Sequence, residues 1–470
     1  MKKTTLIAVA AFAVLLAIVL ATRETQVNEG VLKLTLPVVD GSKVTRIELS
    51  GGQSATLTRE ADHWTVADPK SPEKTYPADD MMVKTALTQL EKLKATEFVT
   101  SKAEKQTELE VDAAKGLHVK LSGITPALDV VIGKANRDGV FVREPNASAV
   151  FVAPAFNRST LDKNVTGWRK KSVTTFAAAD VKELRVAPAG AEPFTLTRAE
   201  SGLTLAPLPK DFRFDAAAAD RLLTQLATLN AQDFGTPPAS ADVLTVFTAT
   251  TKDGKTVTLR LAKKLPAGTA PLSIEGDPET YLLPGWTADA LAKGLEGLRD
   301  LRLTTAEPSK IESLTITTAK GKTAVKRDGT QWKLLEPKTP PAGVELDLTT
   351  ALGVATRLAN LRAAKVATGV DDAKAGLTKP KATVELGLEG GGKQTLRFGA
   401  DASTGQAYVK GSADALLYEL PVFERNNLDK GVELFKKPAP MPSGNVAGLE
   451  QLPPEIRQQL EAQLRQRGAH

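Results

Sequence analysis

The residue types that most often carry catalysis or bind metals are sparse in this sequence. It contains three histidines, His63, His118 and His470, and no cysteine. No HExxH pattern or close histidine pair occurs, so the spacing that binds zinc is missing. A Ser-His-Asp triad would need His63 or His118, and no GxSxG motif supports one. We therefore predict no catalytic residue, no metal site and no cofactor.

A glycine-rich stretch, Gly387–Lys393, has the spacing of a phosphate-binding loop. The next residue is Gln394, where such a loop carries the Ser or Thr that binds magnesium. VELGLE and KQTLRF on either side alternate apolar and polar residues, which is typical of a hairpin. Asp253-Gly254-Lys255 lies between similar alternating segments. We predict hairpin turns at both places and no phosphate site.

Two pairs of adjacent carboxylates, Asp79-Asp80 and Asp371-Asp372, are a further candidate for chemistry. Asp79 follows Pro77 and precedes a helical apolar pattern, so it fits a helix N-cap. Asp371-Asp372 lies in an expected loop and lacks the further oxygen ligands that a calcium loop has at fixed spacing. Trp64 and Trp332 could form a ligand-stacking surface, but their size favours a place in the core.

Composition points to globular domains. The chain has 470 residues, is 42% hydrophobic and carries a net charge of +6, so it can form two to four domains with real cores. Its longest basic cluster is Arg169-Lys170-Lys171, too little for the basic surface that nucleic-acid binding requires. Without cysteine it can have neither disulfides nor an N-terminal lipoprotein anchor.

The N-terminal sequence predicts a location at the membrane. Lys2 and Lys3 precede an uninterrupted apolar run over 6–21, or 4–22 with the flanking threonines. This length is close to what a bilayer crossing needs, and the lysines favour a cytoplasmic N-terminus. We predict a single-pass signal anchor at 1–25, with the bulk of the chain in the periplasm. A cleaved signal peptide, giving a secreted form, is the alternative.

One pattern occurs three times without a gap. The copies are 79–98, 215–234 and 347–366, each opened by an aspartate and each with leucine at the same offset: Asp79 with Leu90, Asp215 with Leu226, and Asp347 with Leu358. The apolar residues recur at helical spacing, so each copy predicts one amphipathic helix. Before two of the copies a tryptophan also recurs at a constant distance: Trp64 and Trp332.

The surrounding sequence predicts strands. VTRIELS, VKELRVA and IESLTIT open the three units, while Pro69, Pro72 and Pro77 predict a stiff loop into the first helix. The predicted fold is α+β: an N-terminal transmembrane helix, then three tandem β-rich repeats, each with one main helix packed on an antiparallel sheet. After a spacer at 26–42, we place repeat 1 at 43–171, repeat 2 at 180–304 and repeat 3 at 309–437.

The last segment, 438–470, differs in composition. A Pro-rich tether leads to a short pattern in which Ile456, Leu460 and Leu464 share one face. The segment is either a weakly populated helix or a docking helix for a partner, because about 15 residues are marginal for an isolated helix.

Residues 43–437 resemble an uncharacterised bacterial family, a numbered domain of unknown function. The resemblance rests on the Cys-free anchor, the TREADHWTV and KRDGTQWKL openings, the helix YPADDMMVKTALTQLEKL and the LDK segments at 161–163 and 428–430. Repeat 2 departs from the pattern, with Leu203 in place of the tryptophan. The family is similar in setting to proteins encoded beside gliding-type ABC export systems. The resemblance implies an accessory role in the envelope and supplies no catalytic residues.

These inferences predict a non-enzymatic, inner-membrane-anchored periplasmic scaffold. Its expected partners are the membrane, through 4–22, and components of an ABC-type transport or surface-assembly complex, with no nucleic acid. The alternative is a periplasmic module that binds glycan or cell wall. A hydrolase ranks third.

Overall fold

The computed structural model describes residues 33–174, 176–403 and 405–437. These residues divide into two compact units. Unit 1 joins the chain up to Pro207 with Ala216–Leu298, and unit 2 joins Leu208–Asp215 with the chain from Arg299 onward. The anchor predicted at 1–25 and the segment 438–470 lie outside the described residues. Within the described ranges, no helix is both long and apolar enough for a membrane crossing.

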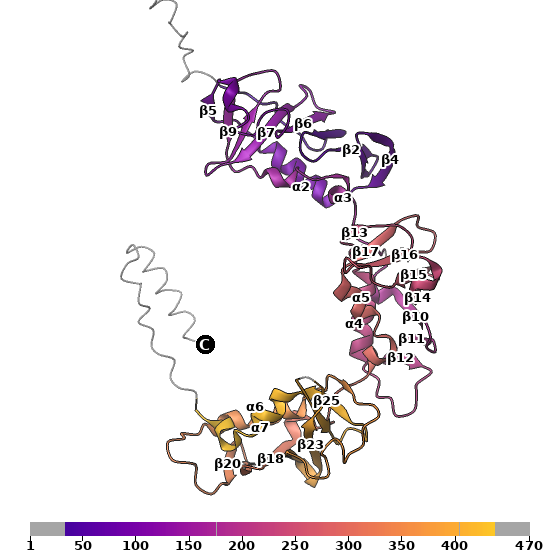
Figure 1. Cartoon of the computed structure of the whole chain (residues 1–470), viewed down its shortest axis with the longest axis vertical. Coiled ribbons are helices and arrows are strands. Elements are labelled where there is room, and N and C mark those ends of the chain that lie inside the picture. The colour runs from indigo at the N-terminus through magenta and orange to yellow at the C-terminus, as the bar shows by residue number, and fades with distance from the viewer. Residues whose placement is uncertain (1–32, 175, 404, 438–470) are drawn as a thin grey trace, which may run out of the picture. The chain divides into compact units, whose positions relative to one another are not determined.

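Three antiparallel sheets confirm the tandem α+β prediction (Figure 1). The first sheet has the order β4-β3-β2-β1-β6-β7-β8-β9-β5. Its strands are β1 Arg46–Ser50, β2 Ala55–Glu60, β3 His63–Asp68, β4 Ser71–Pro77, β5 Glu97–Thr100, β6 Leu117–Ser122, β7 Asp129–Ala135, β8 Val140–Arg143 and β9 Val150–Ala153. Its helices are α2 Asp80–Glu91 and α3 Val165–Trp168.

The second and third sheets repeat this order with eight strands each: β12-β11-β10-β14-β15-β16-β17-β13 and β20-β19-β18-β22-β23-β24-β25-β21. The second consists of β10 Val181–Pro188, β11 Phe194–Ala199, β12 Gly202–Ala206, β13 Asp233–Phe234, β14 Val243–Thr251, β15 Thr256–Ala262, β16 Ala270–Ile274 and β17 Thr280–Leu283. The third consists of β18 Ile311–Thr318, β19 Gly321–Asp328, β20 Gln331–Glu336, β21 Lys365–Val366, β22 Ala382–Leu388, β23 Lys393–Asp401, β24 Gln406–Lys410 and β25 Tyr418–Pro421. The helices are α4 Ala216–Ala227, α5 Gly285–Leu291, α6 Ala351–Ala359 and α7 Val422–Leu428.

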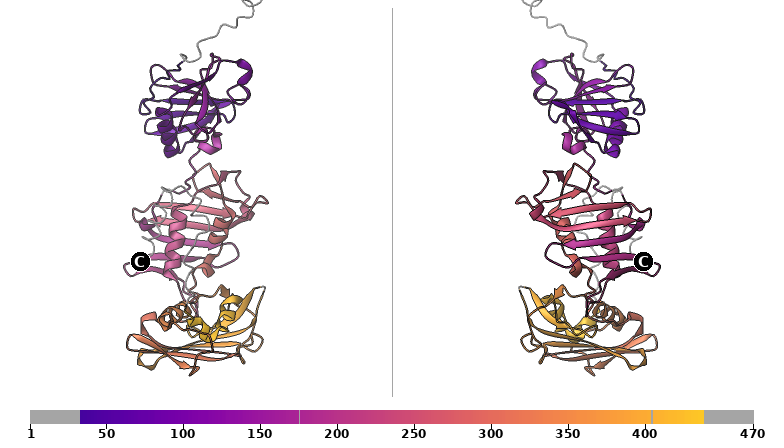
Figure 2. Two further views of the ribbon diagram at one scale, coloured as in Figure 1. Left: turned by 90° about the vertical axis from the view of Figure 1, so that its left-hand side faces the viewer. Right: turned by 90° about the vertical axis from the view of Figure 1, so that its right-hand side faces the viewer.

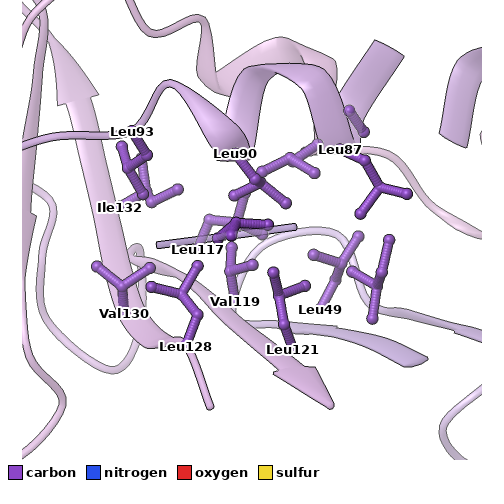
Figure 3. Close-up of a cluster of buried hydrophobic side chains, with 14 of the residues drawn as sticks. Leu49, Leu87, Leu90, Leu93, Leu117, Val119, Leu121, Leu128, Val130 and Ile132 are labelled. Atoms are coloured by element: carbon purple, nitrogen blue, oxygen red, sulfur yellow. The ribbon is translucent and has the colours of Figure 1, made fainter. Parts of the chain in front are cut away.

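Alternating side chains build the core of each repeat between its sheet and its main helix. In the first sheet, Ile47 pairs with Leu121 and Leu49 with Val119 across β1 and β6, and all four are buried. Leu90 of α2 packs onto this apolar face (Figure 3). Figures 1 and 2 show α4 lying in the same way across one face of the second sheet. Period-two strands and a helix with one apolar stripe bury their surfaces against each other.

The main helix is shorter than the predicted segment. In repeat 1 it ends at Glu91, and Phe98 lies on strand β5 and pairs with Phe151 of β9. Phe234 and Val366 lie on the equivalent short strands β13 and β21. The prediction of one helix over 79–98 was therefore wrong for the residues after Glu91. The chain leaves the helix and adds a strand at the far edge of the sheet.

The expected proline loop is also a strand. Ser71–Pro77 forms β4, which pairs with β3 at the edge of the first sheet. Proline lacks an N–H group, so a proline strand is compatible with an edge position and not with the sheet interior. The spacer predicted at 26–42 contributes to the fold as well, because Leu34, Leu36 and Val39 pack against the core of repeat 1.

A second, smaller apolar cluster covers the opposite sheet face in repeats 1 and 3. In repeat 1 it contains Leu109, Val111, Val131, Phe141, Val150 and Val152. In repeat 3 it contains Ala375, Leu377 and Leu417. Strands β8 and β9 are consequently buried along their whole length.

Candidate functional site

The aspartates that open the repeated segment have structural contacts. Asp79 is the N-cap of α2, and its carboxylate accepts hydrogen bonds from the backbone N–H groups of Met81 and Met82, both at 3.0 Å. Asp347 accepts from the N–H of Thr349 at 3.0 Å in the turn that leads into α6. Asp215 precedes α4 in the sequence, and its carboxylate accepts a hydrogen bond from Arg362 at 2.7 Å.

The repeated leucines and tryptophans lie in the cores. Leu90, Leu226 and Leu358 are at most 1% exposed. Trp64 and Trp332 are 7% and 8% exposed. The guanidinium of Arg59 lies 4.9 Å from the centre of the Trp64 ring and donates to the carbonyls of Gly41 and Ser42. Trp64 therefore lies in the core, with the Arg59 guanidinium against its ring.

A cavity of about 530 Å³ lies beside this arginine. It is lined by Gly41, Ser42, Arg59, Ala61, Asp62, Trp64, Asp80, Lys84, Leu87, Thr88 and Glu91. Three of its polar groups are already engaged: Arg59 with the carbonyls above, Asp80 with the N–H of Trp64, and Glu91 with the N–H of Gly41. The cavity therefore offers few free partners for a ligand.

The glycine-rich stretch Gly387–Lys393 forms a hairpin, as predicted. Gly387 pairs with Lys393 across β22 and β23, and the N–H of Leu388 donates to the carbonyl of Gly392. Asp253 lies in the β14–β15 turn, where its carboxylate accepts from the Thr251 hydroxyl and pairs with Lys255. The chain continues as a strand after both turns, so neither has the helix N-terminus of a phosphate loop.

The remaining candidates for chemistry are engaged by neighbouring groups of the chain. Asp371 accepts from the N–H of Lys374, and Asp372 pairs with Lys410 at 3.0 Å. His118 contacts Asp129 on the neighbouring strand. Across the described ranges, no group of three or more His, Cys, Asp and Glu residues is placed to hold a metal. Ile456, Leu460 and Leu464 lie outside the described residues.

Two arginine clusters, one around the buried Arg169 and one around the partly buried Arg213, join consecutive repeats of the described chain. In unit 1, the guanidinium of Arg169 lies 3.9 Å from the ring centre of Tyr76 and 3.4 Å from that of Phe234. Its Nη2 donates to Glu279 at 2.5 Å, and the side chain is only 9% exposed. Aromatic faces attract a guanidinium most strongly when water is excluded. Arg169 therefore binds residues of repeat 1 and repeat 2 at once.

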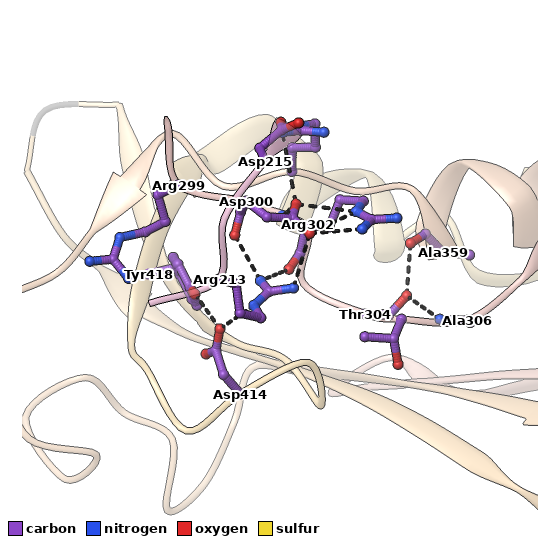
Figure 4. A network of polar contacts seen from close by, with 12 residues as sticks. Arg213, Asp215, Arg299, Asp300, Arg302, Thr304, Ala306, Ala359, Asp414 and Tyr418 are labelled. Carbon is purple, nitrogen blue, oxygen red and sulfur yellow. Dashed lines mark hydrogen bonds and ion pairs between the residues drawn. The ribbon is translucent and has the colours of Figure 1, made fainter. Parts of the chain in front are cut away.

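In unit 2, Arg213 occupies the second cluster (Figure 4). Its Nε donates to Asp414 at 2.7 Å and its Nη1 to Asp300 at 3.3 Å. Nη2 donates to the carbonyls of Asp300 and Arg302. Asp300 also accepts from the guanidinium of Arg302. A planar fork of donors can reach two carboxylates and two carbonyls, which an ammonium group cannot do.

The electrostatics of this cluster keep Asp300 and Arg213 charged and Tyr418 neutral. Burial opposes ionisation of Asp300, but hydrogen bonds from Arg302 and the charge of Arg213 hold the pKa of its carboxyl below the ordinary value. Burial also opposes the charge of Arg213, yet its contacts with Tyr418 and Asp414 raise its pKa. Burial, with a hydrogen bond to Asp414, raises the pKa of Tyr418 to about 12. None of these groups exchanges a proton near neutral pH, so the cluster suits a structural role better than acid–base catalysis.

The sequence patterns predicted neither cluster. Arg169 was identified only as part of a basic run, and Arg213 was not identified at all. A signal was present. An aspartate followed four residues later by a tyrosine occurs at the same place in two repeats, as Asp277 with Tyr281 and Asp414 with Tyr418.

A family model described as "Domain of unknown function (DUF4340)" matches residues 64–246 and again residues 240–380. The chain belongs to this family. The two DUF4340 segments follow one another along the chain, and each runs from one sheet into the next. This agrees with the tandem repeats and with the resemblance to an uncharacterised family. No curated protein and no solved structure matches the chain.

Proposed function

We propose that the protein is a non-enzymatic scaffold, anchored in the inner membrane and extending into the periplasm as an accessory of an ABC-type transport or surface-assembly complex. The observation that carries this proposal is that two arginine clusters join one repeat to the next. Arg169 and Arg213 are each engaged by carboxylates of a repeat that lies later in the sequence. Tandem domains tied in this way extend a surface for partners. The apolar run at 4–22 supplies the anchor.

Two exposed aromatic side chains support an interaction surface. Trp286 is 74% exposed and Phe423 is 58% exposed. They lie in the first turn of α5 and of α7, each two residues after the proline that immediately precedes the helix. The equivalent residue of repeat 1, Phe156, is 7% exposed. Exposed aromatic rings are typical of the central contacts of protein interfaces, so repeats 2 and 3 offer a partner protein equivalent contact points.

The proposed location in the inner membrane is tested first, by fractionating cells and treating them with protease. We expect the full chain in the inner-membrane fraction, with the repeats cleaved only after the outer membrane is opened. Recovery of the full chain from the cytosol would refute the proposal.

The partner is tested by crosslinking in intact cells. Because the chain has no cysteine, Trp286→Cys and Phe423→Cys each introduce a single reactive site. Asp62→Cys is the matched control, because its side chain is 96% exposed and belongs to repeat 1, which contains neither α5 nor α7. We expect a transporter component to crosslink to the first two variants and not to the control. Equal crosslinking of a transporter component to all three variants would refute the proposed interaction surface.

The alternative, a glycan-binding module, keeps one point of support in the exposed ring of Trp286. It predicts that purified cell-wall material retains the full chain and that Trp286→Ala abolishes this retention. The scaffold proposal predicts no retention of either protein.

A further inference from the structure

The loop that precedes strand β9, β17 or β25 is built in two different ways in the three repeats. In repeats 2 and 3, Asp277 and Asp414 each accept two hydrogen bonds from their own loop. The first comes from the N–H two residues later, of Glu279 and Leu416, at 2.9 Å in both cases. The second comes from the tyrosine four residues later: Tyr281 at 2.8 Å and Tyr418 at 2.6 Å. The two loops share one construction.

Both of these loops also contact an arginine from an earlier part of the chain. Arg213 donates to Asp414 itself. Arg169 donates to Glu279, within the loop that Asp277 holds, and lies against Phe234, which pairs with Tyr281. Two equivalent isolated bridges position these arginines: Ala78 pairs with Arg169, and Phe214 pairs with Arg299. Arg169 belongs to the later segment of its bridge, whereas Arg213 precedes Phe214 on the earlier segment of the other bridge. Each guanidinium therefore contacts the same loop of the following repeat, Arg169 through Glu279 and Arg213 through Asp414.

Repeat 1 lacks this construction. The strand register places Phe151 where the other repeats have Tyr281 and Tyr418, because each of the three pairs with the edge strand that follows the main helix. Counting back four residues puts Ala147 where they have Asp277 and Asp414. Repeat 1 therefore has neither the carboxylate nor the hydroxyl.

A different arginine holds the loop of repeat 1 from within. Arg143 is 8% exposed at the end of β8. Its Nε donates to the carbonyl of Val111 at 2.6 Å, and its Nη1 donates to those of Glu144, Pro145 and Ala147 at 2.9, 2.7 and 3.4 Å. The equivalent residues are Ser273 and Lys410, and neither has a guanidinium. Buried carbonyls require a donor, and repeat 1 supplies its own.

We infer that the Asp277–Tyr281 and Asp414–Tyr418 loops are sockets for an arginine delivered by the preceding chain, and that repeat 1 is built as the first repeat of the array. The partner that a socket fits is a guanidinium group on a neighbouring chain segment. Because Arg143 takes this role inside repeat 1, that repeat has no socket for a further repeat placed before it. Terminal repeats of tandem arrays commonly differ from internal ones in this way.

The test is amide hydrogen exchange of the full chain, followed in the three equivalent loops 144–149, 274–279 and 411–416. Arg213→Ala should speed exchange in 411–416 about tenfold or more and leave 144–149 unchanged, because hydrogen bonds to charged groups are lost in one loop only. Arg169→Ala should act on 274–279 alone, and Arg143→Ala on 144–149 alone. Tyr418→Phe removes only the hydroxyl and should give a smaller effect confined to 411–416.

A graft separates a delivered arginine from a self-sufficient loop. The variant Arg143→Ala with Ala147→Asp and Phe151→Tyr gives repeat 1 a socket without an arginine. We expect loop 144–149 to exchange faster than in the original chain, because the grafted aspartate and tyrosine have no arginine to bind. Protection restored to the original level would overturn the inference, because the socket would then need no arginine. Exchange in 411–416 that changes less than about twofold in Arg213→Ala would also overturn it, since opening free energies report such contacts directly.

Discussion

Leu90 offers a direct test of how repeat 1 is held together. This side chain is 1% exposed and lies in the middle of the apolar layer between α2 and the sheet, with Leu117 and Val119 near it (Figure 3). Replacing it with alanine removes three buried carbon atoms. The lost transfer free energy is about 2.4 kcal/mol at about 0.8 kcal/mol per group. The cavity left behind adds to this, and buried leucine-to-alanine changes usually total about 2–5 kcal/mol.

We expect Leu90→Ala to lower the free energy of unfolding of repeat 1 by about 3 kcal/mol. For a domain of this size, such a change lowers the unfolding temperature by about 10 °C or more. Calorimetry of the full chain measures the shift. Amide exchange of β1 and β6 assigns it to the first sheet, while the third sheet should keep its protection.

Thr85→Ala is the matched control on the same helix. Thr85 is exposed, and its hydroxyl donates only to the carbonyl of Met81 one turn earlier. Alanine favours helix at least as well as threonine, so we expect a change within about 0.5 kcal/mol. If Leu90→Ala behaved like Thr85→Ala, the helix would not be covering the sheet in solution, and the packing described for all three repeats would be wrong.

Three further predictions follow from single contacts. Asp79→Ala removes the cap of α2 and should lower the unfolding free energy of repeat 1 by about 1 kcal/mol in urea titrations, whereas Asp79→Asn should retain most of it. Asp300 has a pKa lowered in the folded protein, so its stabilising contribution is present above its ordinary value of 3.8 and is lost as the pH falls through the folded value. Unit 2 should therefore lose stability in acid below about pH 3.8, and thermal unfolding of Asp300→Asn should show a weaker dependence on pH in that range. Arg59→Lys keeps the charge, but a lysine cannot reach both the Gly41 and Ser42 carbonyls while stacking on Trp64. It should therefore speed amide exchange at 41–44 about as much as Arg59→Ala does. Normal protection in Arg59→Lys would show that charge alone suffices.

Local patterns were enough for the parts of the fold that depend on neighbouring residues. The Asp79 cap, the burial of Leu90 and the Gly387–Lys393 hairpin all follow from spacing within a few residues. Repetition extended these predictions to three sheets. The prolines of Ser71–Pro77 concealed strand β4, because proline is compatible with a strand only where its missing N–H faces away from the sheet, and that position depends on the partner strand.

The arginine clusters could not be predicted because they join distant segments. Arg213 reaches Asp414, and Arg169 reaches Glu279, through the pairing of strands and not through spacing in the sequence. A basic residue has the same local sequence pattern whether its side chain is solvated or buried. The signal that would have helped is the repeated aspartate–tyrosine spacing, which has meaning only once the strand register aligns the repeats.

The place of the main helix in the strand order has a consequence for aggregation. In each repeat, the helix follows one edge strand and precedes the strand at the opposite edge, as β4, α2 and β5 do in the first sheet. An edge strand that detaches exposes unpaired backbone groups to other chains. Here both edges belong to the segment that carries the core helix, so an edge cannot peel far from the sheet without pulling on buried leucines. Sheets tethered in this way can be linked in tandem at high local concentration with little risk of merging through their edges.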